Sequence, residues 1–153
     1  MTNETAIALQ ETDAIAVNNV NGYFEGIIAQ VATAGAYTTF KVETLEDKKR
    51  LYKATNDCKL LREYEETPLH ICDFVFAPSD ITDENGLPKT VLGVYLIDAE
   101  GAAYLSTAQG VIKSAVKILR DFGEPASWGQ PLPVVLKETN TAKGRRYKFL
   151  TVE

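Results

Sequence analysis

A run of basic side chains surrounds a tyrosine near the end of the sequence. The basic residues in and beside this run are Lys137, Lys143, Arg145, Arg146 and Lys148. Lysine and arginine bind phosphate oxygens, and an exposed ring such as that of Tyr147 offers a flat surface on which a nucleobase can stack. Gly144 provides a turn whose backbone amides are also free to bind an anion. The run therefore predicts contact with a phosphate-bearing ligand, although a solvated hairpin tip would have the same composition.

A second group of cations falls in a segment with the pattern of a helix. Its members are Lys48, Lys49, Arg50 and Lys53. Phosphate contact is one interpretation of this group, and a solvent-facing helix surface is the other. Tyr95 and Tyr104 complete the candidate set, because each lies in the middle of an expected strand from which a ring could point outward and stack on a base. The alternative is that either ring fills the protein core.

The sequence lacks the motifs of the common catalytic sites. It contains no P-loop, no Gly-x-Gly-x-x-Gly after an expected strand and no Gly-x-Ser-x-Gly. His70 is the only histidine, and Cys58 and Cys72 are too few for a zinc site or a disulfide framework. The acidic residues of one polar loop lack the spacing of a nuclease metal site; they are Asp80, Asp83 and Glu84. We therefore expect no enzyme activity, no metal and no cofactor.

The net charge of −5 argues at first against a polyanionic ligand, but the charges are segregated along the chain. Residues 1–47 carry seven acidic side chains and one basic, whereas residues 48–63 carry six basic and two acidic ones. Residues 107–153 carry eight basic and four acidic side chains. Such segregation permits a basic groove on an acidic protein. A non-enzymatic protein-interaction module or an acidic DNA mimic is the alternative that the net charge leaves open.

The composition is that of one ordinary globular domain. The chain has 153 residues, of which 45% are hydrophobic and 24% are charged. No segment approaches the ~20 uninterrupted apolar residues that a membrane span requires. The first ten residues lack the basic start and apolar core of a secretory signal. We therefore expect a cytoplasmic protein without a membrane partner.

The N-terminal third of the sequence indicates its secondary structure less clearly than the rest of the chain. Residues 1–20 are polar and show no sustained period, which predicts a flexible tail. Residues 23–42 are apolar and rich in β-forming residues, with a break at Ala34-Gly35, which predicts two strands and a turn. Thr44 and Asp47 form a Thr-x-x-Asp capping pattern that predicts the start of a helix. Residues 59–64 predict a second short helical turn.

From residue 65 onward the sequence alternates strands and turns around one amphipathic helix. Residues 69–78, 90–98 and 102–105 predict three antiparallel strands joined by turns. Ser106-x-x-Gln109 has the pattern of a capping box, and the apolar stripe after it predicts a helix over residues 107–122 that ends at Gly123. Residues 134–138 and 145–152 predict two further strands on either side of the basic turn.

This order of elements predicts a mostly β protein with helices, namely an OB-fold. The OB-fold is a five-stranded Greek-key barrel with a helix between its third and fourth strands. Residues 65–153 would form the core barrel, residues 21–64 an extension of the same domain, and residues 1–20 the tail. Its ligand would lie over residues 90–105, flanked by the loops at 79–89 and 139–144. An α+β sandwich built from the same elements is the alternative.

Several segments resemble small single-stranded DNA-binding proteins of bacteriophages and conjugative plasmids. These segments are residues 40–64, residues 96–101, Ser106 with Gly110, residues 122–125 with Trp128, and residues 143–146. The resemblance covers residues 38–153 and implies an OB-fold protein that coats single-stranded DNA during replication or transfer in a bacterial or phage-infected cell. It leaves out the acidic tail, residues 1–20, which we expect to serve as an arm for self-association.

Overall fold

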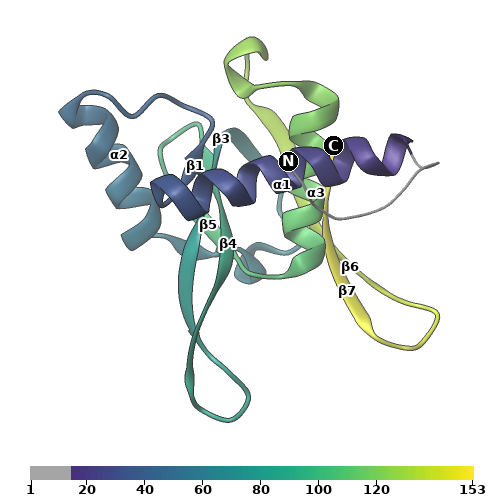
Figure 1. Cartoon of the computed structure of the whole chain (residues 1–153). Coiled ribbons are helices and arrows are strands. Elements are labelled where there is room, and N and C mark those ends of the chain that lie inside the picture. Colours follow the sequence, from purple (N-terminus) through teal and green to yellow (C-terminus); the bar gives the residue numbers. More distant parts are fainter. Residues whose placement is uncertain (1–14) are drawn as a thin grey trace.

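The computed structural model describes residues 15–153, and residues 1–14, which make up most of the expected tail, lie outside the described part. Helices and strands are interspersed along the chain (Figure 1). The helical elements are α1 (Ile15–Ala34), α2 (Leu45–Asn56), α3 (Gln109–Phe122) and the short 3₁₀ turns η1 (Leu61–Tyr64) and η2 (Pro125–Ser127). The strands are β1 (Tyr37–Thr38), β2 (Lys59–Leu60), β3 (Leu69–Thr82), β4 (Pro88–Asp98), β5 (Ala103–Ser106), β6 (Leu132–Asn140) and β7 (Arg146–Val152).

The strands of the described part belong to one curled, seven-stranded sheet. Its hydrogen-bonded order is β2-β5-β4-β3-β6-β7, and β1 pairs with β3 outside this path. Neighbouring strands are antiparallel except β2 and β5, which are parallel. β2 and β7 stand at the two ends of this order and are not paired with each other within residues 15–153. The protein is therefore mostly β with helices, as predicted, and its sheet curls without closing.

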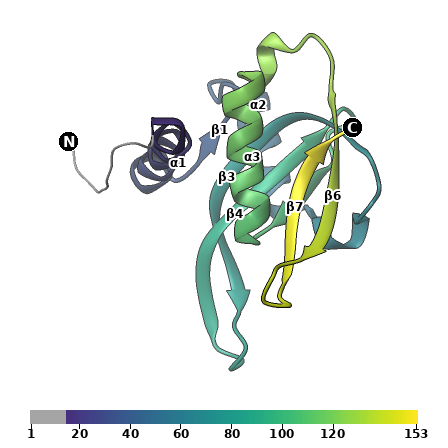
Figure 2. The ribbon, with the colours of Figure 1, turned by 90° about the vertical axis from the view of Figure 1, so that its right-hand side faces the viewer.

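The side of the sheet that faces α3 forms the main hydrophobic core (Figure 2). The buried stripe of α3 consists of Val111, Ile112, Ala115, Val116, Ile118 and Leu119. It packs on Phe74 and Phe76 of β3, on Leu96 of β4 and on Leu136 and Leu150 of β6 and β7. Because burial of one such side chain contributes about 1.5–3 kcal/mol, this cluster is the main source of stability. The helix ends at Gly123, whose φ of 81° a residue with a Cβ adopts only with strain, as predicted.

The opposite side of β3, β4 and β5 is covered by α2 and the segment around it. Here Leu51, Ala54 and Cys58 belong to a second cluster with residues of the sheet, among them Val75, Tyr95, Ile97 and Ala103. The predicted cap of α2 is confirmed, because the Thr44 hydroxyl accepts from the Asp47 amide at 3.1 Å and the Asp47 carboxylate accepts from the Thr44 amide at 3.1 Å. α2 therefore begins where the sequence predicts and shields this face of the sheet.

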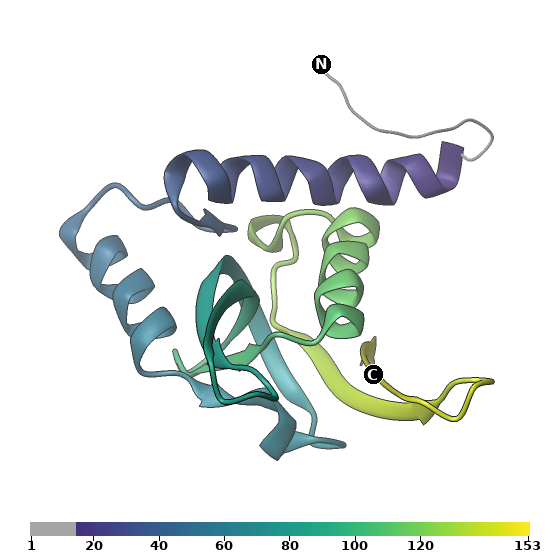
Figure 3. The same cartoon turned by 60° about the horizontal axis from the view of Figure 1, so that its bottom comes forward.

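The first helix contradicts two predictions from the sequence. Residues 15–20 of the expected tail and residues 21–34 of the expected strands together form α1, and only Tyr37–Thr38 is extended in this region. Tyr23, Phe24, Ile27 and Val31 recur at helical spacing and pack against the core beside α3 (Figure 3). Burial of this one helical face outweighs the β-propensity of the segment. The break at Ala34-Gly35 is the end of the helix and not a turn between strands.

Two smaller boundaries also differ from prediction. The capping box at Ser106 is wrong: α3 begins at Gln109 with Ala108 as its N-cap, because the Ser106 hydroxyl accepts from the Ala108 amide and not from a helical amide. In the expected helical turn over residues 59–64, the first two residues pair with β5 as strand β2, and only η1 is helical.

Two hairpins project from the same side of the molecule (Figures 1 and 2). The β3–β4 hairpin turns after Thr82, where the Asp83 carboxylate accepts from the amides of Asn85 and Leu87 at 2.9 Å. The β6–β7 hairpin turns between Thr141 and Arg145, joined by a backbone hydrogen bond of 2.7 Å. The strands β3 and β4 continue well into the expected loop at residues 79–89, so this arm is longer than predicted.

Candidate nucleic-acid interface

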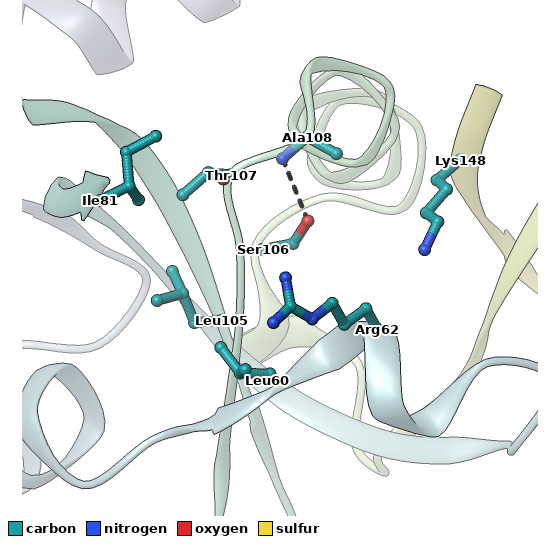
Figure 4. Close-up of a pocket in the computed structure, with 8 residues that line it drawn as sticks. All are labelled: Leu60, Arg62, Ile81, Leu105, Ser106, Thr107, Ala108 and Lys148. Atoms are coloured by element: carbon teal, nitrogen blue, oxygen red, sulfur yellow. Dashed lines mark hydrogen bonds between the residues drawn. The ribbon is translucent and has the colours of Figure 1, made fainter. Parts of the chain in front are cut away.

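The two ends of the curled sheet approach each other at a cavity of about 260 Å³ (Figure 4). Its walls come from β2 and η1, from the β3–β4 hairpin, from the segment that joins β5 to α3, and from β7. The lining residues are Leu60, Arg62, Ile81, Leu105, Ser106, Thr107, Ala108 and Lys148. The cavity therefore lies between the two hairpins, where the sheet is not closed by backbone hydrogen bonds.

Arg62 and Lys148 both direct their charged groups toward this cavity (Figure 4). Arg62 is exposed and forms no ion pair in the part of the chain that the structure describes. Lys148 lies 3.8 Å from Glu138 and 4.0 Å from Glu65, at the outer limit of ion pairing. Two cations that face one space repel each other unless an anion neutralises them. This arrangement suits a phosphate group.

The rest of the cavity wall is largely apolar. Leu60, Ile81 and Leu105 supply aliphatic surface beside the two cations. Gly93 on β4 makes room for one of them, because a Cβ at position 93 would lie 2.8 Å from Cδ1 of Leu105. A wall that combines cations and aliphatic side chains can hold a phosphate together with the face of a sugar or base.

The predicted basic run lies on the β6–β7 hairpin, as expected, but the structure divides it into paired and free cations. Lys137 forms an ion pair with Glu66 at 3.3 Å, and Arg146 forms one with Glu138 at 3.5 Å. Lys143 and Arg145, at the turn, form none among residues 15–153 and are exposed to solvent. Exposed pairs contribute little to stability, so a phosphate can compete for all of these cations.

Tyr147 lies on the other face of β7 from Lys148, because successive side chains of a strand alternate. Its ring is 40% exposed and stacks on Phe149 with the ring centroids 6.1 Å apart. Gly110, at the start of α3, lies directly against this ring, because a Cβ there would lie 2.8 Å from the ring and would clash with the Lys148 carbonyl oxygen. Tyr147 is therefore held in place and still accessible.

Tyr95 and Tyr104 do not point outward, contrary to expectation. Their side chains are only 3% and 5% exposed. Tyr95 lies beneath α2, and Tyr104 packs edge-on against Tyr64 in the main core with ring centroids 5.0 Å apart. Burial raises the pKa of both hydroxyls; burial and a hydrogen bond donated to Asp98 bring the pKa of Tyr104 to about 12. Neither ring can stack on a base unless the elements that cover it move.

The cations of α2 also divide into two groups. Lys48, Lys49 and Lys53 are exposed, and Lys49 forms an exposed ion pair with Glu46 at 3.5 Å. Arg50 instead faces the sheet, where its guanidinium donates to Asp73 at 2.6 Å and lies 4.2 Å from the centre of the Phe40 ring. Arg50 therefore fastens α2 to β3, and only the three lysines remain available to a ligand.

Arg62 is the cavity residue that the sequence does not single out. It belongs to the basic stretch of residues 48–63, but it follows a strand of only two residues, which has no recognisable period. Its position depends on the pairing of β2 with β5, in which Leu60 lies opposite Leu105. A contact between segments so far apart in the sequence leaves no local signal.

The described residues offer little to a metal or to covalent chemistry. In residues 15–153 no group of three or more histidine, cysteine, aspartate or glutamate side chains is placed to hold a metal ion. Cys58 and Cys72 are separate, half-buried thiols, and burial raises the pKa of each. In the same range no helix has the length and apolar character needed to cross a membrane.

A curled, mostly β sheet that carries cations around an apolar cavity defines a class of small proteins suited to bind a phosphate-bearing chain. Comparison with known families makes the assignment specific. The family described as Phage Single-stranded DNA-binding protein matches residues 30–153, so the chain belongs to the phage single-stranded DNA-binding protein family. No curated protein and no solved structure matches the chain. The family match begins inside α1 and includes every strand and both hairpins.

Proposed function

We propose that the protein binds single-stranded DNA without sequence preference at the cavity between β2 and β7 and so coats DNA during replication or transfer, without catalysing a reaction. The observation that carries this proposal is the orientation of Arg62 and Lys148 toward one cavity with an apolar wall. A phosphate between the two side chains would bind to both, and the aliphatic wall would contact the adjacent sugar or base. Membership of the family supports the choice of single-stranded DNA as the ligand.

We infer that the sheet is an OB-type barrel left open on one side. The order β5-β4-β3-β6-β7, with α3 between β5 and β6 in the chain, corresponds to the five strands and the helix of that fold. In OB-folds the loops after the first and fourth strands flank the bound strand, and here these loops are the two projecting hairpins. The cavity lies between them, which supports both the fold and the location of the site.

The β6–β7 hairpin would extend the contact beyond the cavity. Lys143 and Arg145 at its turn are free to bind phosphates that follow the one held by Arg62 and Lys148. A strand that crosses this turn reaches Tyr147 on the other face of β7, where an exposed ring contributes on the order of 1–3 kcal/mol per stacked base. The strand would therefore be held mainly through its backbone, and binding would tolerate any sequence.

An acidic DNA mimic on the same barrel fits the site less well. A mimic presents carboxylates in the places where DNA presents phosphates, whereas the cavity presents two cations. A mimic would also ignore an oligonucleotide, so a binding measurement separates the two functions. The location expected for the proposed function is the cytoplasm of a phage-infected or plasmid-bearing cell.

The direct test replaces Arg62 and Lys148 by alanine, singly and together. We expect each substitution to weaken binding of labelled oligo-dT by roughly tenfold, because a hydrogen-bonded ionic contact is lost. Each should also reduce the slope of log affinity against log salt by about 0.7, the value for one phosphate contact on a single strand. Fluorescence anisotropy at several salt concentrations measures both quantities.

Lys41→Ala is the matched control for these variants, because it also removes one exposed cation but does not line the cavity. It should leave the affinity and the salt slope close to those of the unmodified protein. If the double variant of Arg62 and Lys148 binds oligo-dT like the unmodified protein, the cavity is not the binding site. If the unmodified protein does not bind oligo-dT at all, the proposed function is wrong.

We also propose that copies of the protein associate through the N-terminal segment when they coat DNA. Residues 1–14 carry three acidic side chains and no basic one, so they complement the basic hairpin of a neighbouring copy in charge. Contact between neighbours is a common source of cooperativity along a strand.

A further inference from the structure

The outer surface of α2 carries Tyr52, which is more exposed than Tyr147. Tyr52 is 68% exposed, and two turns away on the same side of the helix lies Leu45, which is equally exposed. The lysines Lys48, Lys49 and Lys53 surround the ring, and these five side chains line one shallow surface depression. We call this set the α2 patch. Large apolar side chains normally avoid water, so an open ring among cations points to a ligand with flat faces and negative charge.

The inner side of α2 covers the sheet surface on which an OB-fold would bind its ligand. An OB-fold binds its ligand on the face of the second and third strands, which here are β4 and β5. Leu51 and Ala54 of α2 pack over that face and cover Tyr95. A strand of DNA therefore cannot reach the sheet at this point and meets the outer side of α2 instead. Tyr52 lies on the outer side of α2, and Tyr95 is buried beneath the inner side of the same helix.

The charges of the α2 patch favour nucleic acid over an apolar protein partner. Lys48 and Lys53 form no ion pair in the described range, and the pair of Lys49 with Glu46 is exposed and weak. Three cations around one ring on a protein of net charge −5 would repel one another without an anionic partner. Backbone phosphates on either side of a stacked base satisfy this arrangement.

The segment that follows α2 carries further cations toward the cavity. After α2 the chain passes through Lys59, whose ammonium group lies 5.7 Å from the ring centres of Tyr64 and Tyr104, to Arg62. Cations therefore follow one another from the α2 patch to the cavity wall on a single short segment. Such a row can track the phosphates of one continuous strand.

We propose that Tyr52 stacks on a base of the bound single-stranded DNA and that the α2 patch forms a second part of the binding path, beyond the cavity. This inference rests on the proposed function, because it assigns a further contact to the same ligand. It also predicts that the contact matters only for oligonucleotides long enough to leave the cavity and reach α2.

The test compares Tyr52→Ala, Tyr52→Leu and Tyr52→Phe on oligo-dT of increasing length by fluorescence anisotropy. For long oligonucleotides we expect the alanine and leucine variants to bind about 5- to 100-fold more weakly, the range for loss of one stacked base. The phenylalanine variant should bind like the unmodified protein, because it keeps the ring. With the shortest oligonucleotides that bind, all four proteins should have the same affinity.

Ile28→Ala is the control, because it removes an exposed apolar side chain from α1, outside the proposed DNA path. Thermal unfolding followed by circular dichroism should show the same midpoint for all variants, since Tyr52 contributes little to the core. A second measurement uses oligo-dT with 5-iodo-deoxyuridine, which cross-links to stacked aromatic rings under ultraviolet light. The cross-linked peptide should contain Tyr52.

The outcomes separate this inference from the proposed function. If Arg62→Ala with Lys148→Ala weakens binding but Tyr52→Ala matches the unmodified protein at every length, the α2 patch is not used and the cavity stands. If Tyr52→Leu binds as tightly as Tyr52→Phe, stacking is rejected. If the Tyr52 variants lose affinity while the cavity variants do not, the α2 patch binds DNA and the proposed cavity is wrong.

Discussion

Tyr104 shows how one side chain can fix several elements at once. Its ring packs on Tyr64 in the core, and its hydroxyl donates to Asp98 at 3.0 Å. The same Asp98 carboxylate accepts from the amides of Glu100 and Ala102 at 2.9 Å, which shapes the turn between β4 and β5. The phenol therefore joins the core to a tight turn.

This environment predicts a loss of stability at high pH. The folded pKa of Tyr104 is about 12, against an ordinary value of 10.0, so the neutral phenol favours the folded state. A group whose folded pKa is raised contributes fully below its unfolded pKa, and this contribution disappears as the pH rises from about 10 to 12. Tyr104→Phe should be less stable than the unmodified protein at pH 8, but its stability should fall less steeply above pH 10. Urea unfolding at a series of pH values measures both effects, and parallel curves for the two proteins would show that Tyr104 does not titrate in this range.

At the scale of single residues the sequence predicts which types of side chain bind, but not which of them are accessible. Tyr95, Tyr104 and Tyr147 each lie within a predicted strand, yet of the three only Tyr147 is exposed. The difference arises from α2, which covers Tyr95, and from the curl of the sheet, which places Tyr104 in the core. Arg50 is also unavailable to a ligand because of a tertiary contact, since its partner Asp73 lies on β3, which is distant in the sequence. Accessibility depends on these tertiary contacts.

The β6–β7 hairpin is the element on which the sequence and the structure agree best. Two long strands pair from Val134 with Val152 to Asn140 with Arg146 and carry their cations out to the turn. We expect a projecting arm of this kind to contact the DNA backbone without reading the base sequence.

Charge reversal in this hairpin should weaken binding to every sequence alike. Arg145→Glu with Arg146→Glu replaces two cations that can contact phosphates, so affinity for oligo-dT and oligo-dA should fall together and the salt slope should become smaller. The control is Lys117→Glu with Arg120→Glu on α3, which changes the net charge by the same amount. Fluorescence anisotropy gives both quantities. Equal affinity of the hairpin variant and the unmodified protein would remove the hairpin from the interface.

Most elements of residues 65–153 could be predicted because local patterns define them. The stripe of α3, its end at Gly123 and the turn between β4 and β5 all depend on residues close in sequence. α1 could not be predicted, because Gly22, Gly26 and several β-branched residues weaken its helical pattern. It is a helix because Ile27 is buried and Tyr23, Phe24 and Val31 pack against the core beside it. The Tyr23 hydroxyl also donates to Glu124 at 3.0 Å, and the Tyr37 hydroxyl donates to the same carboxylate at 3.4 Å.

At the scale of the whole molecule, α1 lies across the side of the domain away from the projecting hairpins (Figures 1 and 3). A segment that leaves the start of α1 therefore departs from a different part of the surface than the proposed DNA path. We expect an arm that begins there to contact a neighbouring copy while both copies remain on DNA.

Removal of residues 1–14 tests this arrangement and leaves α1 intact. We expect the truncated protein to bind a single short oligonucleotide with unchanged affinity, because the cavity and the hairpins are retained. On long single-stranded DNA it should bind with lower cooperativity, because contacts between neighbours are lost. Titrations on long DNA and sedimentation of the free protein measure the two properties. Unchanged cooperativity together with unchanged mass would reject the N-terminal segment as an arm.

The gap between β2 and β7 has a consequence for how DNA enters and leaves. The hydrophobic core fills the inside of the curled sheet, so no strand can pass through it, and the proposed cavity lies at the surface beside this gap. We therefore expect the site to accept a chain from the side, so that a covalently closed circle, or a template held at both ends by replication enzymes, can be bound and released without a break. Exchange onto such molecules should therefore be as fast as onto linear ones.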